Sequence, residues 1–364
     1  MASKLLFAPC KSVNLEPKNS IGAKWERLLD RLDLAPTVKG RRVAVKMHLG
    51  GGTGFTTVHP FFVRKLVQKV RAAGAAEVFV TDTPGAVRVA VDRGYTSEVV
   101  GCALVPATGT ADKYVYTKEI KPAFRTLKEV QLAGEIMDAD VLLDLSHVKG
   151  HGACGFGGAS KNLSMGCVTQ ATRGVIHALE GGLEWDAEKC SQCHVCQENC
   201  PNGAIKFDHD KFRVFFHHCK FCQHCVLICR KKAIRLVGGG YKDFQQGMGL
   251  TTAKVLERFL PNRCLFINLL INVTVYCDCW GMTTPTLVPD IGILAGRDIV
   301  AIEQATLDLI KVKDLIGSAL PAGWKLGKGK HLFEKLYGKD PYVIVSALEK
   351  LGCGSRKYAL ETVD

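Results

Sequence analysis

The stretch RRVAVKMHLGGGTG occupies residues 41–54 and joins an apolar run to a glycine-rich loop. Apolar residues at helical spacing follow in residues 59–74, and Gly74 is a typical C-terminal helix cap. A second apolar run, AEVFVTDTP, spans residues 76–84. Strand, helix and strand in this order are typical of a parallel sheet with right-handed crossovers. This part of the chain therefore predicts an α/β fold.

The same alternation of strands and helices returns further along the chain. Residues 138–149 (DADVLLDLSHVK) predict a strand that runs into a histidine and a lysine. Residues 250–260 predict a helix, residues 263–277 a buried strand, and residues 297–317 an amphipathic helix. We therefore expect a mostly parallel sheet with helices on both faces.

Two cysteine runs lie in the middle of the chain. CSQCHVCQENCP (190–201) follows the pattern C-x2-C-x2-C-x3-C-P of bacterial iron–sulfur ferredoxins. CKFCQHCVLICR (219–230) repeats the cysteines 29 positions later, which predicts a pseudo-twofold axis. In two-cluster ferredoxins the fourth cysteine of each run binds the other cluster. The predicted ligands are Cys190, Cys193, Cys196 and Cys229 for one 4Fe–4S cluster, and Cys219, Cys222, Cys225 and Cys200 for the second.

These runs interrupt the α/β pattern, which resumes after them. We expect an α/β domain whose first part is 1–183 and whose second part is 238–364, with an α+β ferredoxin-like module inserted at 184–237. A zinc ribbon would need two C-x2-C pairs rather than two runs of four cysteines. Arg230 stands where a proline would follow Cys229, and its charge is expected to raise the potential of the first cluster.

Composition limits the compartment and the partners. The chain has 364 residues, 16 cysteines and a formal charge of +13. Cluster thiolates need a reducing, anaerobic setting, and no secretory signal is seen, so we expect a cytoplasmic protein. The apolar run 264–277 is too short to span a membrane. Because the basic residues are scattered, nucleic acid is not the expected partner; an acidic redox protein such as a ferredoxin, or a small anionic substrate, fits the charge better. An oligomer is compatible with the composition.

The richest set of reactive side chains follows the predicted strand at 138–149. HVKGHGACGFGGASKN (147–162) lies at the carboxyl end of that strand, the edge where open α/β sheets bind ligands. Histidines can transfer protons near neutral pH, and lysines can hold a carboxylate or phosphate. The alternative is a tight loop whose polar groups cap neighbouring elements. The candidate catalytic residues are His147, Lys149, His151, Lys161 and Asn162.

The glycine loop after His48 is a candidate anion site, because its amides precede a helix. It matches neither the Walker motif nor G-x-G-x-x-G, and the chain carries no recognisable flavin or nicotinamide motif. Its residues are Gly50, Gly51, Gly52, Thr53 and Gly54.

Cys277 and Cys279 follow the predicted buried strand, whose alternation would place both thiols on one face. Such a pair could bind a metal or accept electrons, or could be ordinary buried thiols. Asp82 and Asp290 precede or follow prolines and are candidate acids or turn caps.

Several of these stretches together resemble one family, the domain of unknown function 362, in the form fused to a two-cluster ferredoxin module. They are VKMHLGGGTGFTTVHP, VFVTDTPG, SHVKGHGACGFGGASKNLSMGC, CDCWGMTTPTLVPDIGILAGRDIVAIEQAT and the cysteine runs. The resemblance implies an iron–sulfur protein whose reaction is not settled, and a fold akin to the N-terminal domain of lactate racemases.

Three functions remain open on this basis. The first is a ferredoxin-dependent oxidoreductase, in which the clusters exchange electrons with a site on the α/β domain. The second is an electron carrier whose α/β domain is a docking scaffold. The third is a metal or cluster maturation factor that uses Cys277 and Cys279.

Overall fold

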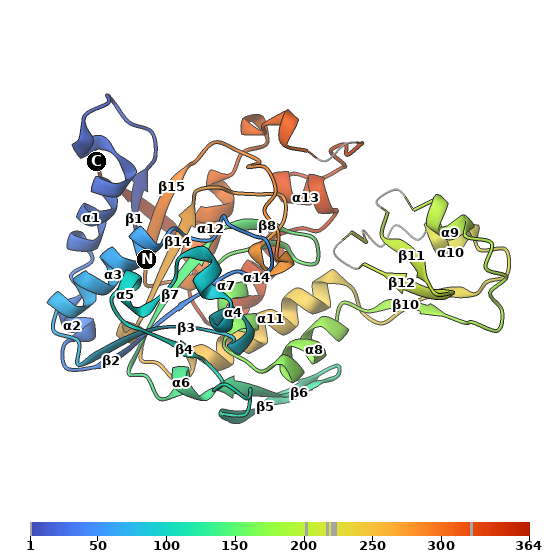
Figure 1. Ribbon diagram of the computed structural model, residues 1–364, viewed down its shortest axis with the longest axis horizontal. Helices are drawn as coiled ribbons and strands as arrows, with labels where there is room; N and C mark the ends of the chain where they lie inside the picture. The colour runs from blue at the N-terminus through green and yellow to red at the C-terminus, as the bar shows by residue number, and fades with distance from the viewer. Residues whose placement is uncertain (1, 201–202, 216–217, 220–223, 321–322) are drawn as a thin grey trace.

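The computed structural model describes residues 2–200, 203–215, 218–219, 224–320 and 323–364. Its centre is an eight-stranded sheet (Figure 1). In spatial order the strands are β16 (Tyr358–Thr362), β1 (Ser3–Pro9), β15 (Gly292–Gly296), β14 (Cys264–Leu270), β7 (Val141–His147), β2 (Arg42–Met47), β3 (Glu77–Asp82) and β4 (Ala103–Pro106). The helices outside the cysteine runs are α1 (Ile21–Arg31), α2 (Ala35–Val38), α3 (Pro60–Ala72), α4 (Pro84–Arg88), α5 (Ser97–Val100), α6 (Gly134–Met137), α7 (Ala159–Gly166), α8 (Gln170–Ala178), α11 (Tyr241–Leu256), α12 (Ile299–Leu309), α13 (Leu332–Tyr337) and α14 (Tyr342–Lys350).

The sheet is mixed but mostly parallel, which confirms the predicted α/β fold class. From β4 through β3, β2 and β7 to β14, every neighbouring pair is parallel. β15 runs antiparallel to both β14 and β1, and β16 is parallel to β1. The carboxyl ends of the five parallel strands therefore share one edge, where ligands of such sheets bind.

Both faces of the sheet are buried under helices, as alternating side chains require. Val43 and Val45 of β2 belong to a buried cluster with Trp25 of α1 and with residues of α3. Ala44, between them, belongs to a second cluster on the other face, with Leu163 of α7 and residues of α11, α12 and α14. The apolar side chains of β2 therefore point to both faces of the sheet, and both faces are buried.

Two elements are shorter than the sequence predicts. β14 ends at Leu270, although the apolar run continues to Cys277. Asn272 has a φ of 48°, a left-handed conformation that cannot continue an extended strand. The prediction that strand alternation aligns Cys277 and Cys279 is therefore wrong, because both lie at a 3-10 turn, Asp278–Trp280. Similarly, α12 ends at Leu309 and does not fill 297–317.

The cysteine-rich segment forms two small antiparallel pairs to one side of the main body (Figure 1). Its elements are β10 (Gly182–Trp185), α9 (Val195–Glu198), β11 (Ile205–Asp208), β12 (Lys211–Val214), α10 (His224–Ile228) and β13 (Ile234–Val237). β10 pairs with β13, and β11 with β12. β10 and β12, α9 and α10, and β11 and β13 each begin 29 positions apart, so the sequence repeat is also a structural repeat.

Two further hairpins lie outside the sheet: β5 (Val115–Phe124) with β6 (Leu127–Ala133), and β8 (Lys149–His151) with β9 (Gly155–Gly157). Within the described part of the chain, every helix is too short or too polar to cross a bilayer.

A buried carboxylate fixes the start of α7, the helix that carries Lys161 and Asn162. Glu303 Oε1 accepts the amide of Ala159 at 2.9 Å, and Oε2 accepts the amide and the hydroxyl of Ser160. The Nδ2 atom of Asn268 in β14 also donates to Oε1, at 3.1 Å. A negative group is favourable at a helix N-terminus, and here it ties α7 to β14 and α12.

We expect Glu303→Ala to lower the free energy of unfolding by about 3 kcal/mol, because it leaves several buried donors without an acceptor. Anaerobic chemical denaturation followed by circular dichroism measures this. The matched control is Glu257→Ala, which removes an exposed partner of Lys254 and should cost less than about 1 kcal/mol. Equal losses in the two variants would contradict the role assigned to Glu303.

Candidate functional site

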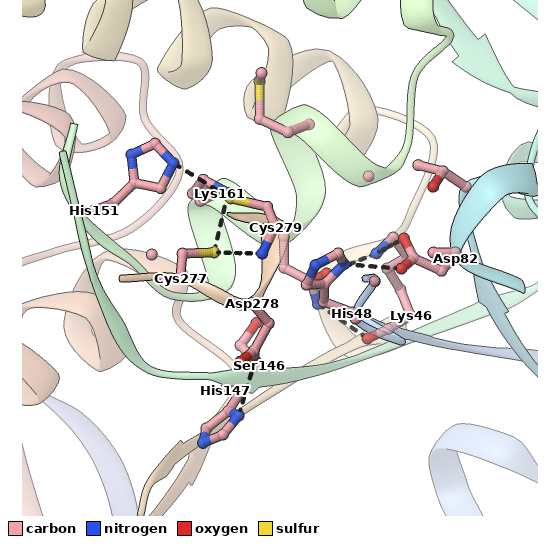
Figure 2. Close-up of a pocket in the computed structure, with 18 of the residues that line it drawn as sticks. Lys46, His48, Asp82, Ser146, His147, His151, Lys161, Cys277, Asp278 and Cys279 are labelled. Carbon is pink, nitrogen blue, oxygen red and sulfur yellow. Dashed lines mark hydrogen bonds and ion pairs between the residues drawn. The ribbon is translucent and has the colours of Figure 1, made fainter. Parts of the chain in front are cut away.

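A cavity of about 360 Å³ opens at the carboxyl ends of β2, β3 and β7. Its walls come from these strand ends, from α7 and α8, and from the loop that follows β14 (Figure 2). The lining residues with ionisable groups are Lys46, His48, Asp82, His147, His151, Lys161, Arg173, His177, Cys277, Asp278 and Cys279.

A buried ion pair forms the floor of the cavity. Lys46 Nζ lies 3.0 Å from Asp82 Oδ1 and 2.6 Å from Asn162 Oδ1. The other carboxylate oxygen of Asp82 lies 3.0 Å from His48 Nδ1 and accepts the amide of Leu49. Burial alone would raise the pKa of Asp82, but Lys46 and His48 hold it well below its usual range. In return, and against the effect of burial, Asp82 raises the pKa of His48.

Asn162 is oriented by a second buried carboxyl group. Its Nδ2 atom donates to Asp144 Oδ1 at 2.9 Å, and Ser146 donates to Oδ2 at 2.7 Å. Burial raises the pKa of Asp144 to about 8, because the charged form loses its hydration. Asn162 thus connects the Lys46–Asp82 pair to β7.

Four side chains from two separate segments, 151–161 and 277–279, meet at the other end of the cavity. Lys161 Nζ lies 3.5 Å from Cys277 Sγ and 3.6 Å from Cys279 Sγ. His151 Nε2 lies 3.6 Å from Cys279 Sγ. A hydrogen bond with Cys279, together with the Lys161 ammonium, lowers the pKa of Cys277 well below its ordinary value. The same hydrogen bond raises the pKa of Cys279, so the pair favours one thiolate and one thiol.

The three ligand atoms of His151, Cys277 and Cys279 lie within 4.8 Å of one another, close enough for one metal ion. The backbone amides around His151 argue against a metal-binding role for this histidine. The amides of Ala153 and Cys154 point at His151 Nδ1 at 3.2 and 3.3 Å. Nδ1 therefore acts as an acceptor, and in the neutral ring the proton is on Nε2, which faces Cys279. Metal-binding histidines instead donate from their other nitrogen.

The structure brings most of the predicted catalytic residues together. His151, Lys161 and Asn162 line the cavity. His147 also lines it, but its Nδ1 faces Asp278 at 3.2 Å and its Nε2 faces the carbonyl of Ile271 at 2.7 Å. Lys149 does not line the cavity. Its ammonium donates to the carbonyl of Asn272 at 2.6 Å, so it supports the loop that carries the two cysteines.

The glycine loop contributes less than the sequence suggests. Gly50 and Gly51 line the cavity, whereas Gly52, Thr53 and Gly54 do not. The amide of Thr53 donates to the carbonyl of Gly281 at 2.7 Å. A Cβ on Gly52 would clash with that same carbonyl. This loop therefore packs against the turn that follows Cys279 and holds it in place.

Some site residues were missed by the sequence analysis. Lys46 and Asp144 are fully buried, and each lies between two apolar residues of its strand. A charged residue inside such a strand is a usable signal, because an unpaired buried charge is too costly to retain. Arg173 and His177 enter the cavity from α8, and nothing in their local sequence marks them. Burial, and then Lys161, lower the pKa of His177 to about 4.

The second cysteine run packs against this site. Lys339 Nζ donates to the carbonyl of Cys219 at 3.2 Å and also to the carbonyl of Gly152, next to His151. Its ion pair with Glu180 at 3.3 Å secures the chain just before β10. The ring of His218 lies 5.7 Å from that of Tyr276 and 5.6 Å from that of Trp280, which flank the two cysteines. Cys222 lies outside the described residues.

The fold and site are those of an α/β protein with a cavity at the strand ends and a cysteine-rich insertion. The chain belongs to the family described as "Domain of unknown function (DUF362)", which matches residues 43–308.

Other similarities are partial. The chain is 40% identical over 53 residues to the pyruvate synthase subunit PorD of Methanocaldococcus jannaschii, which covers 14% of this chain and 62% of that protein. A crystal structure of a Thermotoga maritima protein aligns with 70% of this chain and 52% of its own, at 12% identity and a TM-score of 0.38. The lactate racemase apoprotein of Thermoanaerobacterium thermosaccharolyticum aligns with 68% of this chain and 49% of its own, at 12% identity and a TM-score of 0.33. Both scores are too low to support an argument.

Asp82→Asn should lower the free energy of unfolding by about 3–5 kcal/mol, because Lys46 would keep its buried charge without a counter-charge. The lowered pKa of Asp82 means that its contribution is present at all pH values above about 4 and is lost only in stronger acid. The raised pKa of His48 adds a second contribution to the free energy of unfolding. This contribution is fully present below about pH 6.5 and is lost as the pH rises through the folded-state pKa of His48.

Denaturation of both proteins between about pH 5 and pH 9 measures these two parts. The difference in the free energy of unfolding between wild type and Asp82→Asn should become smaller towards alkaline pH but should not vanish. Asp30→Asn, which removes an exposed partner of Lys69, is the control and should show neither effect. A difference that grows with pH would contradict the assigned roles.

Proposed function

We propose that this protein is an iron–sulfur oxidoreductase in which residues 184–237 form an inserted two-cluster module. The module exchanges electrons with a site in the cavity, where a small anionic substrate binds. The observation that carries the proposal is that the His218 ring stacks on Tyr276, next to Cys277, while Lys339 links the carbonyl of Cys219 to that of Gly152 in the His151 loop. An electron carrier needs this kind of fixed, close placement to serve one site.

The described cysteines fit two clusters in the crossed arrangement. Cys196 and Cys225 are buried in one small cluster, and Cys200 and Cys229 pack against it, so cysteines of both runs lie together. Backbone amides point at the sulfurs in a repeated way, from Ala204 to Cys200 at 3.2 Å and from Ala233 to Cys229 at 3.3 Å. Such N–H···S bonds favour thiolates and tune cluster potentials. When bound, the clusters would supply one-electron transfer.

The charge of the cavity supports an anionic substrate. Lys161, Arg173 and His48 offer positive groups, whereas the carboxylates of Asp82 and Asp278 are already paired. The Nε2 atom of His48 is buried and has no hydrogen-bond partner among the described residues. Because Asp82 favours its charged form, His48 could donate this proton to a bound anion.

The far end of the module fits an acidic redox partner. Arg230, Lys231 and Lys232 are exposed beside Cys229, and Leu227 is 78% exposed next to them. Basic and apolar groups together are typical of a transient docking surface. Electrons would then enter at the first cluster and leave through the second, one of whose expected ligands is Cys219, which Lys339 links to the His151 loop. We place the protein in the reducing cytoplasm for the same reasons of thiolate chemistry.

The other two functions fit the geometry less well. A docking scaffold has no need of a cavity with paired thiols and buried cations. A metal maturation factor would use His151 as a ligand, and its Nδ1 contacts oppose that. The match to a pyruvate synthase subunit supports a redox role over the maturation role.

Anaerobically purified protein should contain about eight irons and eight acid-labile sulfides. Cys200→Ser should retain about half of each, because it removes one ligand of the second-run cluster only. Iron and sulfide assays with electron paramagnetic resonance measure this, and Cys264→Ala, a buried cysteine of β14, is the control. Zinc in place of iron, or about four irons in the wild type, would refute the proposal.

Lys339→Met should loosen the module, because Glu180 loses its buried partner and the Cys219 carbonyl loses a donor. Limited proteolysis near residue 180 should accelerate at least about tenfold, equivalent to about 1.4 kcal/mol of lost docking energy. Iron content should stay near that of the wild type. Lys335→Met, on the short helix α13 that precedes Lys339, is the control. Unchanged cleavage would mean that the module is held by other contacts.

A further inference from the structure

We infer that Cys277 and Cys279 form a redox-active dithiol–disulfide couple, and that this couple is the two-electron station of the cavity. The inference rests on the proposed electron supply from the cysteine-rich segment. It assigns the electron acceptor that the proposed function leaves open.

The position of the two sulfurs supports a couple. Both cysteines flank one residue of a 3-10 turn, and the amide of Cys279 points at Cys277 Sγ at 3.5 Å. The sulfurs lie within 4.8 Å of each other, a gap that side-chain rotation can close. Cys277 is buried, whereas Cys279 is exposed towards the cavity. One accessible and one protected thiol are what an exchange reaction requires, since only one sulfur should be attacked.

Two donors stabilise the reduced form. The Lys161 ammonium lies about equally far from both sulfurs, and the Nε2–H of His151 faces Cys279. Gly157 leaves the space for this arrangement, because a Cβ there would lie 3.1 Å from Lys161 Cδ. A neutral disulfide gains nothing from either donor, whereas a thiolate gains from both. Lys161 therefore raises the reduction potential of the couple.

The electron count agrees with the proposed clusters. Reduction of one disulfide breaks the S–S bond and takes up two electrons, which leaves two thiolates. One proton from solvent gives a thiol and a thiolate, and Lys161 balances the remaining charge. Two iron–sulfur clusters, each a one-electron donor, together provide the two electrons. The external reductant is the low-potential carrier that docks on the module.

Aromatic rings connect the second cysteine run to the Cys277–Cys279 couple. Tyr276 and Trp280 directly flank the cysteine pair, and both rings lie against His218, the residue before Cys219. The rings of Tyr276 and Trp280 are 5.2 Å apart. The couple thus lies between the second cysteine run and the substrate cavity.

The test uses the full holoprotein. It is equilibrated anaerobically in dithiothreitol buffers of defined potential, quenched with acid, alkylated after denaturation and digested for peptide mass spectrometry. We expect a peptide with an internal Cys277–Cys279 disulfide that converts to a doubly alkylated form with two-electron dependence. Lys161→Gln should shift the midpoint to lower potential, about 30 mV for each tenfold loss of thiolate stabilisation. Lys335→Gln should not shift it.

Cys200→Ser separates this inference from the proposed function. In that variant dithiothreitol should still reduce the couple, whereas reduction by a photoreduced low-potential carrier should be lost. Absence of the disulfide at every potential, in protein with full iron content, would overturn the inference alone. A metal ion bound stoichiometrically by Cys277, Cys279 and His151 would also overturn it. A disulfide that titrates normally in protein without iron would leave the couple in place and refute the cluster proposal.

Discussion

The buried ion pair between Lys46 and Asp82 is the interaction on which the site depends. Both side chains are buried near the carboxyl ends of neighbouring strands, so neither charge could be retained without the other. Asn162 and Asp144 extend the pair to α7 and β7. Four elements are thereby fixed at one edge of the sheet. Lys161, one residue before Asn162, takes its place over the cysteine pair as a consequence.

The second constraint is the end of β14. The left-handed Asn272 turns the chain away from the sheet and over the strand ends. Lys149 and Asp278 then anchor the loop from beneath, with the Lys149 ammonium bonded to the Asn272 carbonyl and 3.7 Å from Asp278. The cysteines reach the cavity because the strand stops early. Had it continued to Cys277, they would have extended past the edge of the sheet.

The sequence allows the fold class to be predicted because burial on both faces leaves long apolar strands, and the helices show their own period. It also shows the 29-residue repeat of the cysteine runs, since duplication preserves spacing. It could not show that Lys149 faces away from the cavity, because the choice depends on the turn at Asn272. Nor could it show Lys339, which contacts Gly152, Glu180 and Cys219 from a distant helix end. Contacts of this kind are set by packing and leave no local pattern.

Two covalent ends limit how the cysteine-rich segment can move relative to the main body. A terminal fusion would have one tether and would sample many orientations. Here β10 and β13 pair at the junction, so both ends leave the main body side by side. Lys339 then bonds to the entering chain at Glu180 and to the second run at Cys219. One ammonium therefore ties the second cysteine run to the loop of His151. The two halves of the sequence repeat differ for this reason in their surroundings as well as in their sequences.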